Sequence, residues 1–441
     1  MTEAGLVDGV AGGRRKGERA RGDEEDGEGE GEKDRGVGKE VVESRTGGTQ
    51  VPGRVFEMLR FLGAFLYQDT ILLQKLCKVL KADLLQARAA AATAAATAAA
   101  SAASSAPAAL CNGPSLGALT PAATANGPVS PEPDSLLAAP DAPAATAASA
   151  AAETAAAAAR EVEGRVVEAL EASLLPALQA VVASPPVCMQ LWEVLACLPF
   201  QERYRLYGEW EKETETNPLV LAARQIARLD TRRTLKRLAK ENLKPTGRLV
   251  AKLAHSNPLT VLRTIVVQVE AYKEMIPPVV DAFKYFNQLE FDILEYVVIE
   301  RLALPRSTIK EDGLNIADWL QCLASFWGSV CKKYPLVELR GLLSYLVNRL
   351  HQGEAVELVL LQELMEQMAG IESNENLTEE QLEALAGGET LRQLTASFGQ
   401  AKNNKAMARS MGRLKDALLP GKGERNLAVP LLVLIARQRS K

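Results

Sequence analysis

Regularly spaced basic side chains are the residues of this sequence whose types and spacing could best support a chemical role. From position 224 to position 252, arginine or lysine recurs at every fourth residue, and two more arginines stand beside the series. We call the following ten residues the basic ridge: Arg224, Arg228, Arg232, Arg233, Lys236, Arg237, Lys240, Lys244, Arg248 and Lys252. A step of four residues turns a helical side chain by about 40°, so the series winds slowly around a helix and is interrupted near Pro245. Such a surface can bind RNA phosphates or an acidic partner, and the other interpretation is a solvated helix face beside acidic neighbours.

A second basic cluster stands closer to the end of the sequence. Its members are Lys402, Lys405, Arg409, Arg413 and Lys415. The segment contains few large apolar residues, so we expect a mobile basic loop. No aromatic residues alternate with these cations, and base stacking of the kind that recognises single strands is therefore not indicated.

Residues that could support catalysis or bind a metal are sparse. The sequence has only two histidines, His255 and His351, and its six cysteines form no CxxC pair. It contains no glycine-rich phosphate loop and no HExxH pattern. We therefore expect no enzymatic activity, no cofactor and no metal site. A local structural role is expected for His255, which precedes a helix start.

An aromatic cluster marks the point where long helical patterns become continuous. The stretch 191–210 concentrates five large rings in a chain that is only 5% aromatic. These rings are Trp192, Phe200, Tyr204, Tyr207 and Trp210. Each aromatic residue buries a large area, so we expect the cluster to build a core. Two arginines between the rings, Arg203 and Arg205, are candidates for contact with a partner.

Apolar residues at spacings of three and four predict helices throughout the parts of the sequence that can fold. Asn217-Pro218 and Asn257-Pro258 each place a capping residue before a proline at a helix start. The clearest helix is predicted at 315–334, and a capping box at 378–381 predicts another. No long alternating pattern indicates strands. We predict an all-α fold, a HEAT-like helical-repeat array or α-solenoid.

Composition divides the chain into five regions. Charged and glycine-rich residues at the start predict disorder, and the tract rich in alanine and proline predicts a flexible insertion. The predicted organisation is a disordered charged tail at 1–53, a helical hairpin at 54–86, a low-complexity linker at 87–163, a helical-repeat middle domain at 164–370, and short helices with a basic loop at 371–441. A net charge of −4 argues against a uniformly basic nucleic-acid binder. No apolar stretch indicates a membrane span or a secretory signal, so we expect a cytosolic or nuclear protein.

Several long motifs resemble one known family. They include LPFQERYRLYGEW at 198–210, TLKRLAKENLKPTGRLVAKLAHSNPLTVL at 234–262, PPVVDAFKYFNQLEFDILEYVVIE at 277–300 and LLQELMEQMAGIE at 360–372. These segments resemble the subunit 2 family of the THO complex, the core of the transcription–export assembly on nascent messenger RNA. The resemblance covers about 54–86 and 165–441. The sequence departs from the family in being much shorter and in carrying the alanine- and proline-rich insertion.

The resemblance implies a nuclear scaffold protein without catalytic activity. Its expected partners are other THO subunits, a DEAD-box RNA helicase and the messenger ribonucleoprotein, and its expected role is in messenger RNA assembly and export. Residues 190–370 would correspond to a section of the family that is similar to the middle domain of translation initiation factors, a type of domain that docks such helicases. The alternative is a module that binds RNA directly through the basic ridge.

Overall fold

Strong helix formers occur throughout the chain, and the structure is built from helices. The computed structural model describes residues 51–104, 142–213, 217–370, 404–421 and 425–439, all within the compact unit Thr49–Lys441. These ranges contain no strand, and their one isolated β-bridge joins Ile309 to Ile316. The predicted all-α fold is therefore confirmed. None of the described helices combines the length and the apolar character that crossing a membrane requires.

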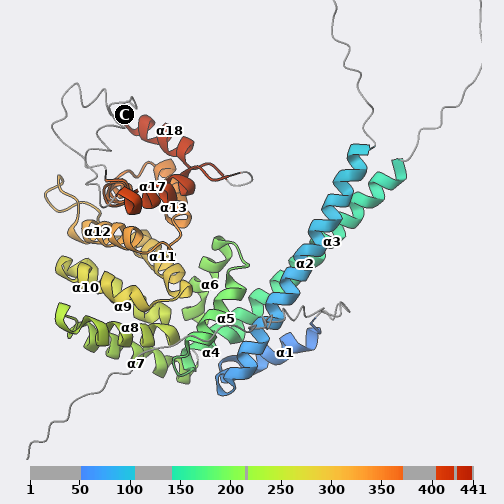
Figure 1. Ribbon diagram of the computed structural model, residues 1–441, viewed down its shortest axis with the longest axis horizontal. Helices are drawn as coiled ribbons and strands as arrows, with labels where there is room; N and C mark the ends of the chain where they lie inside the picture. Colours follow the sequence, from blue (N-terminus) through green and yellow to red (C-terminus); the bar gives the residue numbers. More distant parts are fainter. Residues whose placement is uncertain (1–50, 105–141, 214–216, 371–403, 422–424, 440–441) are drawn as a thin grey trace, which may run out of the picture. The chain divides into compact units, whose positions relative to one another are not determined.

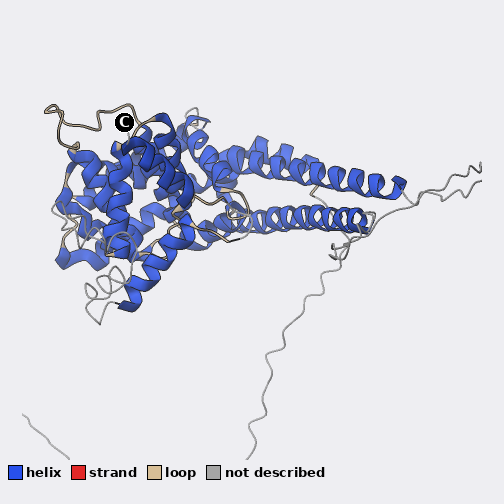
Figure 2. Ribbon diagram, turned by 90° about the horizontal axis from the view of Figure 1, so that it is seen from above, coloured by secondary structure: helices blue, strands red, loops and turns tan. Residues whose placement is uncertain are grey.

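The long hairpin near the start of the described chain is formed by α2 and α3, which corrects the prediction of a hairpin within 54–86. Figures 1 and 2 show α2 and α3 running side by side, and they contact each other along much of their length. The elements here are α1 (Gly53–Leu62), the 3₁₀ helix η1 (Gly63–Gln68), α2 (Thr70–Ser104) and α3 (Ala142–Ala169). The leucines Leu73, Leu80 and Leu84 of α2 are fully buried with Cys77, at spacings of three and four. This periodicity is what the sequence predicted for a packed helix face.

The alanine-rich tract is more helical than we expected. The linker prediction for 87–163 is corrected at both ends, because α2 continues to Ser104 and α3 already begins at Ala142. Alanine has the highest intrinsic helix propensity, so a run of alanines extends a helix that packing has already started. Polar residues within the run also fit a helix, since Thr93, Thr97 and Ser101 each donate a hydroxyl hydrogen bond to the carbonyl three residues earlier. Residues 105–141 lie outside the described part of the chain, as does the tail at 1–50.

A proline shapes the end of α3. Pro176 stands at the second position of α4 (Leu175–Ala180), directly after a π-helical turn, η2 (Leu170–Leu174). Proline lacks the amide hydrogen of an ordinary helical turn and crowds the carbonyl four residues earlier. A π-turn widens the helix at such a point. At Pro176 the helix therefore changes its type locally.

From α5 onward, helices pack against neighbours that lie one or two helices away along the chain. Several of them contact both the next helix and the one after it, as in an array of paired helices (Figure 1). The elements are α5 (Pro185–Leu195), α6 (Phe200–Glu213), α7 (Pro218–Leu235), η4 (Lys240–Asn242), α8 (Leu243–Ser256), α9 (Pro258–Ala271), η5 (Lys273–Met275), α10 (Ile276–Ala282), η6 (Phe283–Tyr285), α11 (Gln288–Ala303), α12 (Asp318–Lys333), α13 (Arg340–Gln352), η7 (Val356–Leu358), α14 (Val359–Leu364) and the π-turn η8 (Met365–Ala369). The helix predicted at 315–334 is α12. The capping box predicted at 378–381 lies outside the described residues.

Four members of the second basic cluster, from Lys405 to Lys415, belong to a helix, which corrects the prediction of a mobile loop, and Lys402 lies outside the described residues. Helix α17 (Asn404–Leu418) contacts η8 and α13, and α18 (Ala428–Arg439) contacts α13. Leu414 and Ala417 are buried, three residues apart on one face, and this face was too short for the composition to reveal. Arg413 donates hydrogen bonds to the backbone carbonyls of Cys331 and Val337, at 2.9 and 2.7 Å. Its role is therefore structural.

The rings of the aromatic cluster differ in their burial. Tyr207 and Trp210 are buried in the core, whereas Trp192, Phe200 and Tyr204 are half-buried. Tyr296 of α11 lies 5.7 Å from both Tyr204 and Tyr207, measured between ring centroids. The cluster thus joins α6 to α11.

Arg203, which we expected to contact a partner, is instead part of this interface. It is 5% exposed and donates to both carboxylate oxygens of Asp292, at 3.0 and 2.7 Å. Tyr207 donates to the same carboxylate at 2.7 Å. Burial raises the pKa of Asp292 above its ordinary value, while the guanidinium beside it acts in the opposite direction. Arg203 therefore stabilises the contact of α6 with α11. Arg205, by contrast, remains exposed and pairs with Glu202 and Glu209.

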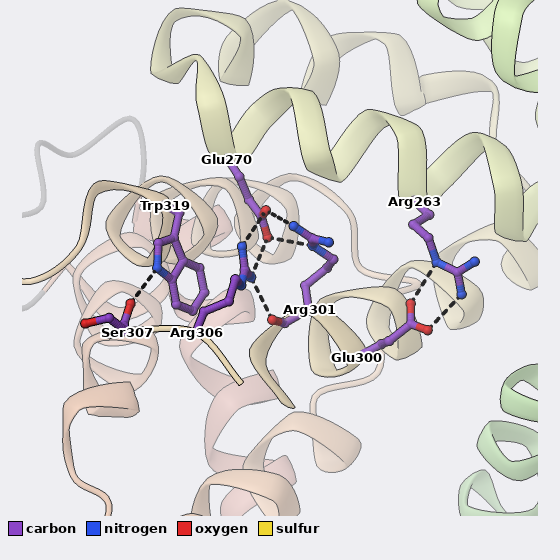
Figure 3. A network of polar contacts seen from close by, with 7 residues as sticks. All are labelled: Arg263, Glu270, Glu300, Arg301, Arg306, Ser307 and Trp319. Carbon is purple, nitrogen blue, oxygen red and sulfur yellow. Dashed lines mark hydrogen bonds and ion pairs between the residues drawn. The ribbon is translucent and has the colours of Figure 1, made fainter. Parts of the chain in front are cut away.

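A second network of charges, shown in Figure 3, holds the segment between α11 and α12. Glu270 of α9 is buried and accepts hydrogen bonds from Arg301 and from Arg306, the latter at 3.0 and 3.2 Å. The guanidinium carbon of Arg306 also lies 3.7 Å from the centroid of the Trp319 ring. Trp319 donates its indole N–H to the Ser307 carbonyl at 2.9 Å. A long connection is thereby fixed to two helices of the array.

Candidate nucleic-acid interface

The basic ridge lies on two helices, α7 and α8, which pack against each other. Helix α7 begins where the sequence predicted, because the Asn217 side chain accepts the Leu219 amide at 3.1 Å and Pro218 takes the first helical position. Helix α7 ends at its C-cap residue Lys236, so Arg237 and Lys240 lie in the connection that leads through η4 to α8. The break between the two helices therefore precedes Pro245, which lies inside the first turn of α8.

The inward face of α7 determines which cations remain exposed. Its buried positions recur at spacings of three and four, as an amphipathic helix requires. They are Val220, Arg224, Ala227, Thr231, Thr234 and Leu235. The outward face carries Arg228, Arg232, Arg233 and, just past the helix end, Lys236 and Arg237.

The prediction that Arg224 belongs to the exposed binding surface is therefore wrong. It is 8% exposed, and its guanidinium donates to the Gln179 side chain at 3.3 Å and to the Trp210 carbonyl at 3.2 Å. Regular spacing could not reveal this, because a step of four gradually moves around the helix and begins on the buried side. Arg224 stabilises the contact of α7 with its neighbours.

Most of the remaining ridge is exposed and free of ion pairs. On α8, Lys244, Arg248 and Lys252 are exposed, and Arg248 lies 5.7 Å from the Tyr285 ring. The side chain of Lys240 is outside the described part of the structure. Within the described residues, one exposed member of the basic ridge forms an ion pair: Arg233 pairs with Asp230 at 3.2 Å.

The local charge is strongly positive in a chain that is acidic as a whole. The segment 217–256 contains only two acidic residues, Asp230 and Glu241, against the ten cations of the ridge. Unpaired guanidinium and ammonium groups on an exposed surface attract polyanions over about a Debye length. Three exposed apolar side chains accompany them, Ile226, Leu229 and Leu249. The surface therefore combines charge with apolar area, as interfaces do.

One cluster of metal-ligand types was not anticipated from the sequence. The Cys188, His255 and Glu290 donor atoms lie within 4.8 Å of one another, and all three residues are buried. Glu290 is already engaged: Oε1 lies 2.6 Å from His255 Nδ1 and 3.3 Å from the Cys188 sulfur, and Oε2 accepts the Asn287 amide. Burial and the Glu290 charge raise the pKa of the Cys188 thiol. Since a metal binds the thiolate, this arrangement is better described as a hydrogen-bonded link between α5, α8 and α11.

One sign of such buried polar groups was present in the sequence but was not recognised there. Asp292 and Glu295 are acidic residues inside the otherwise apolar run of α11, where nearly every residue is buried. Glu295 accepts the Leu342 amide at 3.0 Å, and burial raises its pKa to about 8. Isolated charges in a buried helix indicate a hidden partner, but the pattern does not identify that partner.

A helical-repeat protein with exposed charged and apolar surfaces is the class that this fold defines. Comparison with known proteins gives the family. Residues 49–248 match the family described as THO complex subunit 2 N-terminus, and residues 250–324 match the family described as Transcription- and export-related complex subunit. The chain belongs to the THO complex subunit 2 family, which confirms the resemblance seen in its motifs.

Individual relatives agree with this assignment. The chain is 65% identical over 266 residues to THO complex subunit 2 of Arabidopsis thaliana, covering 60% of this chain and 14% of the relative. It is 44% identical over 267 residues to the human protein of that name, covering 60% of this chain and 16% of the relative. The identity to the Saccharomyces cerevisiae protein is 30% over 220 residues, or 49% of this chain and 14% of the relative. The match thus spans about one seventh of the length of these relatives.

Proposed function

We propose that this chain is a non-catalytic scaffold segment of the THO transcription–export complex. Its helices would hold other THO subunits and a DEAD-box RNA helicase during messenger ribonucleoprotein assembly and messenger RNA export in the nucleus. The observation that carries this proposal is the family match over 49–324, which includes both the N-terminal hairpin and the first part of the helical array.

A scaffold must keep its binding surfaces in a fixed relation, and the internal contacts support such a role. Arg203 with Asp292 fastens α6 to α11, and Glu270 with Arg301 and Arg306 fastens α9 to the segment after α11. A helicase held on such an array would be influenced by stabilisation of one arrangement of its lobes rather than by added chemistry.

A scaffold also needs surfaces for partners, and the N-terminal helices offer an apolar one. Met58, Phe61, Phe65 and Ile71 are exposed large apolar side chains near one another in sequence, and Phe61 is 91% exposed. Large exposed apolar side chains that gather on a surface are characteristic of protein interaction sites.

Recovery of THO subunits with a tagged full-length chain tests the proposal. We expect the wild-type chain to retain other THO subunits from nuclear extract, and the double variant Phe61→Asp, Phe65→Asp to retain fewer of them. Leu314→Asp is the matched control, because Leu314 is 89% exposed in the segment between α11 and α12. Failure of the wild-type chain to recover any THO subunit would refute the scaffold proposal.

Direct RNA binding is the second candidate function, supported by the exposed and unpaired members of the basic ridge. Reversing the charges of Arg228, Arg232 and Lys236 to glutamate is expected to abolish most binding to oligouridylate. The wild-type affinity should fall steeply with salt, because each neutralised phosphate releases counterions. Equal affinity of the wild-type chain and the triple variant would exclude this function.

A further inference from the structure

A small pocket opens between the end of α7 and the start of α8, in the middle of the basic ridge. Its volume is about 290 Å³. The lining includes Arg233 and Thr234 from α7, Arg237 from the turn, and Asn242, Thr246 and Leu249 from the start of α8. Two guanidinium groups, two hydroxyls and an amide thus belong to the lining, although the Asn242 amide already donates to the Arg237 carbonyl. This is a donor-rich composition of the kind that binds anions.

Thr246 gives the pocket an unused hydrogen-bond donor. The residue is only 9% exposed, and it forms no hydrogen bond with any other residue in the described ranges. The other threonine differs, since Thr234 already donates to the Asp230 carbonyl at 2.7 Å. The Thr246 hydroxyl oxygen is not one of the fully buried polar atoms that lack a partner, so it remains accessible and can donate to a ligand or a water.

The helix that borders the pocket favours a negative charge. Helix α8 has 14 residues, and Asn242, Pro245 and Thr246 at its beginning all line the cavity. The N-terminus of a helix carries a partial positive charge and unsatisfied amide groups. The competing carboxylate is Asp230, whose pair with Arg233 is solvent-exposed and can be exchanged for another anion at little cost.

The cations outside the pocket indicate what kind of anion it takes. Arg228, Arg232 and Lys236 precede it on α7, and Lys244 and Arg248 follow it on α8, all of them exposed. A single phosphorylated side chain would leave these groups unused, whereas a chain of phosphates can contact several of them. A nucleic-acid backbone therefore fits the surroundings better than a phosphopeptide does.

We propose that this pocket holds one backbone phosphate of a single-stranded RNA, gripped by Arg233, Arg237 and the Thr246 hydroxyl. The proposal deepens the RNA-binding candidate function and rests on it. The remaining cations of the basic ridge contact neighbouring phosphates without reading the bases, so binding is independent of sequence.

Three substitutions in the full chain and one rescue variant test the pocket, with a fluorescent 15-nucleotide oligouridylate as the probe and anisotropy as the measurement. Arg237→Gln is expected to weaken binding about tenfold, the value of a hydrogen-bonded charge. Arg228→Gln removes the same charge outside the pocket and should weaken binding only about two- to threefold. Thr246→Val is expected to weaken binding about three- to fivefold, although it changes no charge, and Thr246→Ser should restore it.

The salt dependence separates the two effects. Arg237→Gln should reduce the slope of log affinity against log salt by about one, whereas Thr246→Val should leave the slope unchanged. Wild-type affinity in Thr246→Val, together with equal losses in Arg237→Gln and Arg228→Gln, would overturn the pocket while leaving the ridge intact. Tighter binding of a phosphoserine peptide than of the oligouridylate would also overturn it. Recovery of THO subunits should be unaffected by all three substitutions. The result of the pocket test is therefore independent of the scaffold proposal.

Discussion

The interface of α6 with α11 and the surface of α7 and α8 use the same residue types for opposite purposes. Arg203 lies in the first region, buried against Asp292 and Tyr207. Arg232 lies in the second, exposed and without an ion pair in the described residues. Both arginines belong to amphipathic helices and have basic or aromatic neighbours in sequence. The comparison shows that the partner of an arginine, more than its sequence neighbours, determines whether it serves folding or is available for binding.

The largest expected effect belongs to the buried pair. Arg203→Ala leaves the Asp292 carboxylate in the interior without its cation, and we expect the free energy of unfolding to fall by about 3–5 kcal/mol. Urea denaturation of the full chain, followed by circular dichroism, measures this change. Arg205→Ala is the control, since Arg205 is two positions away and exposed. If Arg203→Ala lowers the free energy of unfolding no more than Arg205→Ala does, Arg203 does not stabilise the interior.

The free energy of unfolding should depend on pH through a buried carboxyl group at the same α6–α11 interface. Burial raises the pKa of Glu295 to about 8 from an ordinary value of 4.5, so the folded chain keeps a proton that the unfolded chain releases. The free energy of unfolding should therefore decrease as pH rises from about 4.5 to about 8, by about 5 kcal/mol, and then level off.

The variant Glu295→Gln checks this assignment, because a glutamine cannot ionise. Its unfolding free energy should vary less across that pH range than that of the wild type. Glu202→Gln is the surface control, since Glu202 forms an exposed ion pair with Arg205. Identical pH profiles for the wild type and Glu295→Gln would show that Glu295 does not titrate in this range.

Gly341 probes the space around the same carboxylate. A Cβ at this position would lie 2.8 Å from Glu295 Oε1 and 2.8 Å from the Tyr204 hydroxyl oxygen, closer than such contacts allow. We expect Gly341→Ala to lower the free energy of unfolding by about 1–3 kcal/mol, the usual range for overpacking. Gly412→Ala, where nothing lies within 4 Å of the added carbon, should have a much smaller effect. Equal melting temperatures for the two variants would contradict the close packing at Gly341.

The sequence predicted the helices of this fold better than it predicted the partners of its charges. Local rules were sufficient for α7, because Asn217, Pro218 and the apolar spacing all act within a few residues. They were insufficient for Arg203, whose partner Asp292 lies 89 positions away. They also failed for Arg224, since exposure depends on which face the neighbouring helices cover. The loop prediction for Arg413 failed for a related reason: α17 packs on η8 and α13 of the array, and the composition of a short segment does not contain that information.

The smallest expected effect on stability belongs to Arg232 on the exposed surface of α7. Arg232→Gln removes a charge that no described acidic residue pairs with, so we expect the free energy of unfolding to change by less than about 0.5 kcal/mol. Its affinity for oligouridylate should nevertheless fall by about two- to threefold at low salt and by less at high salt, as screening reduces its contribution. Denaturation and anisotropy measured on the same preparation compare the two effects directly. A marked loss of stability would assign Arg232 a structural role like that of Arg203, because only a residue that contributes to packing or pairing in the folded state can change the free energy of unfolding by that much.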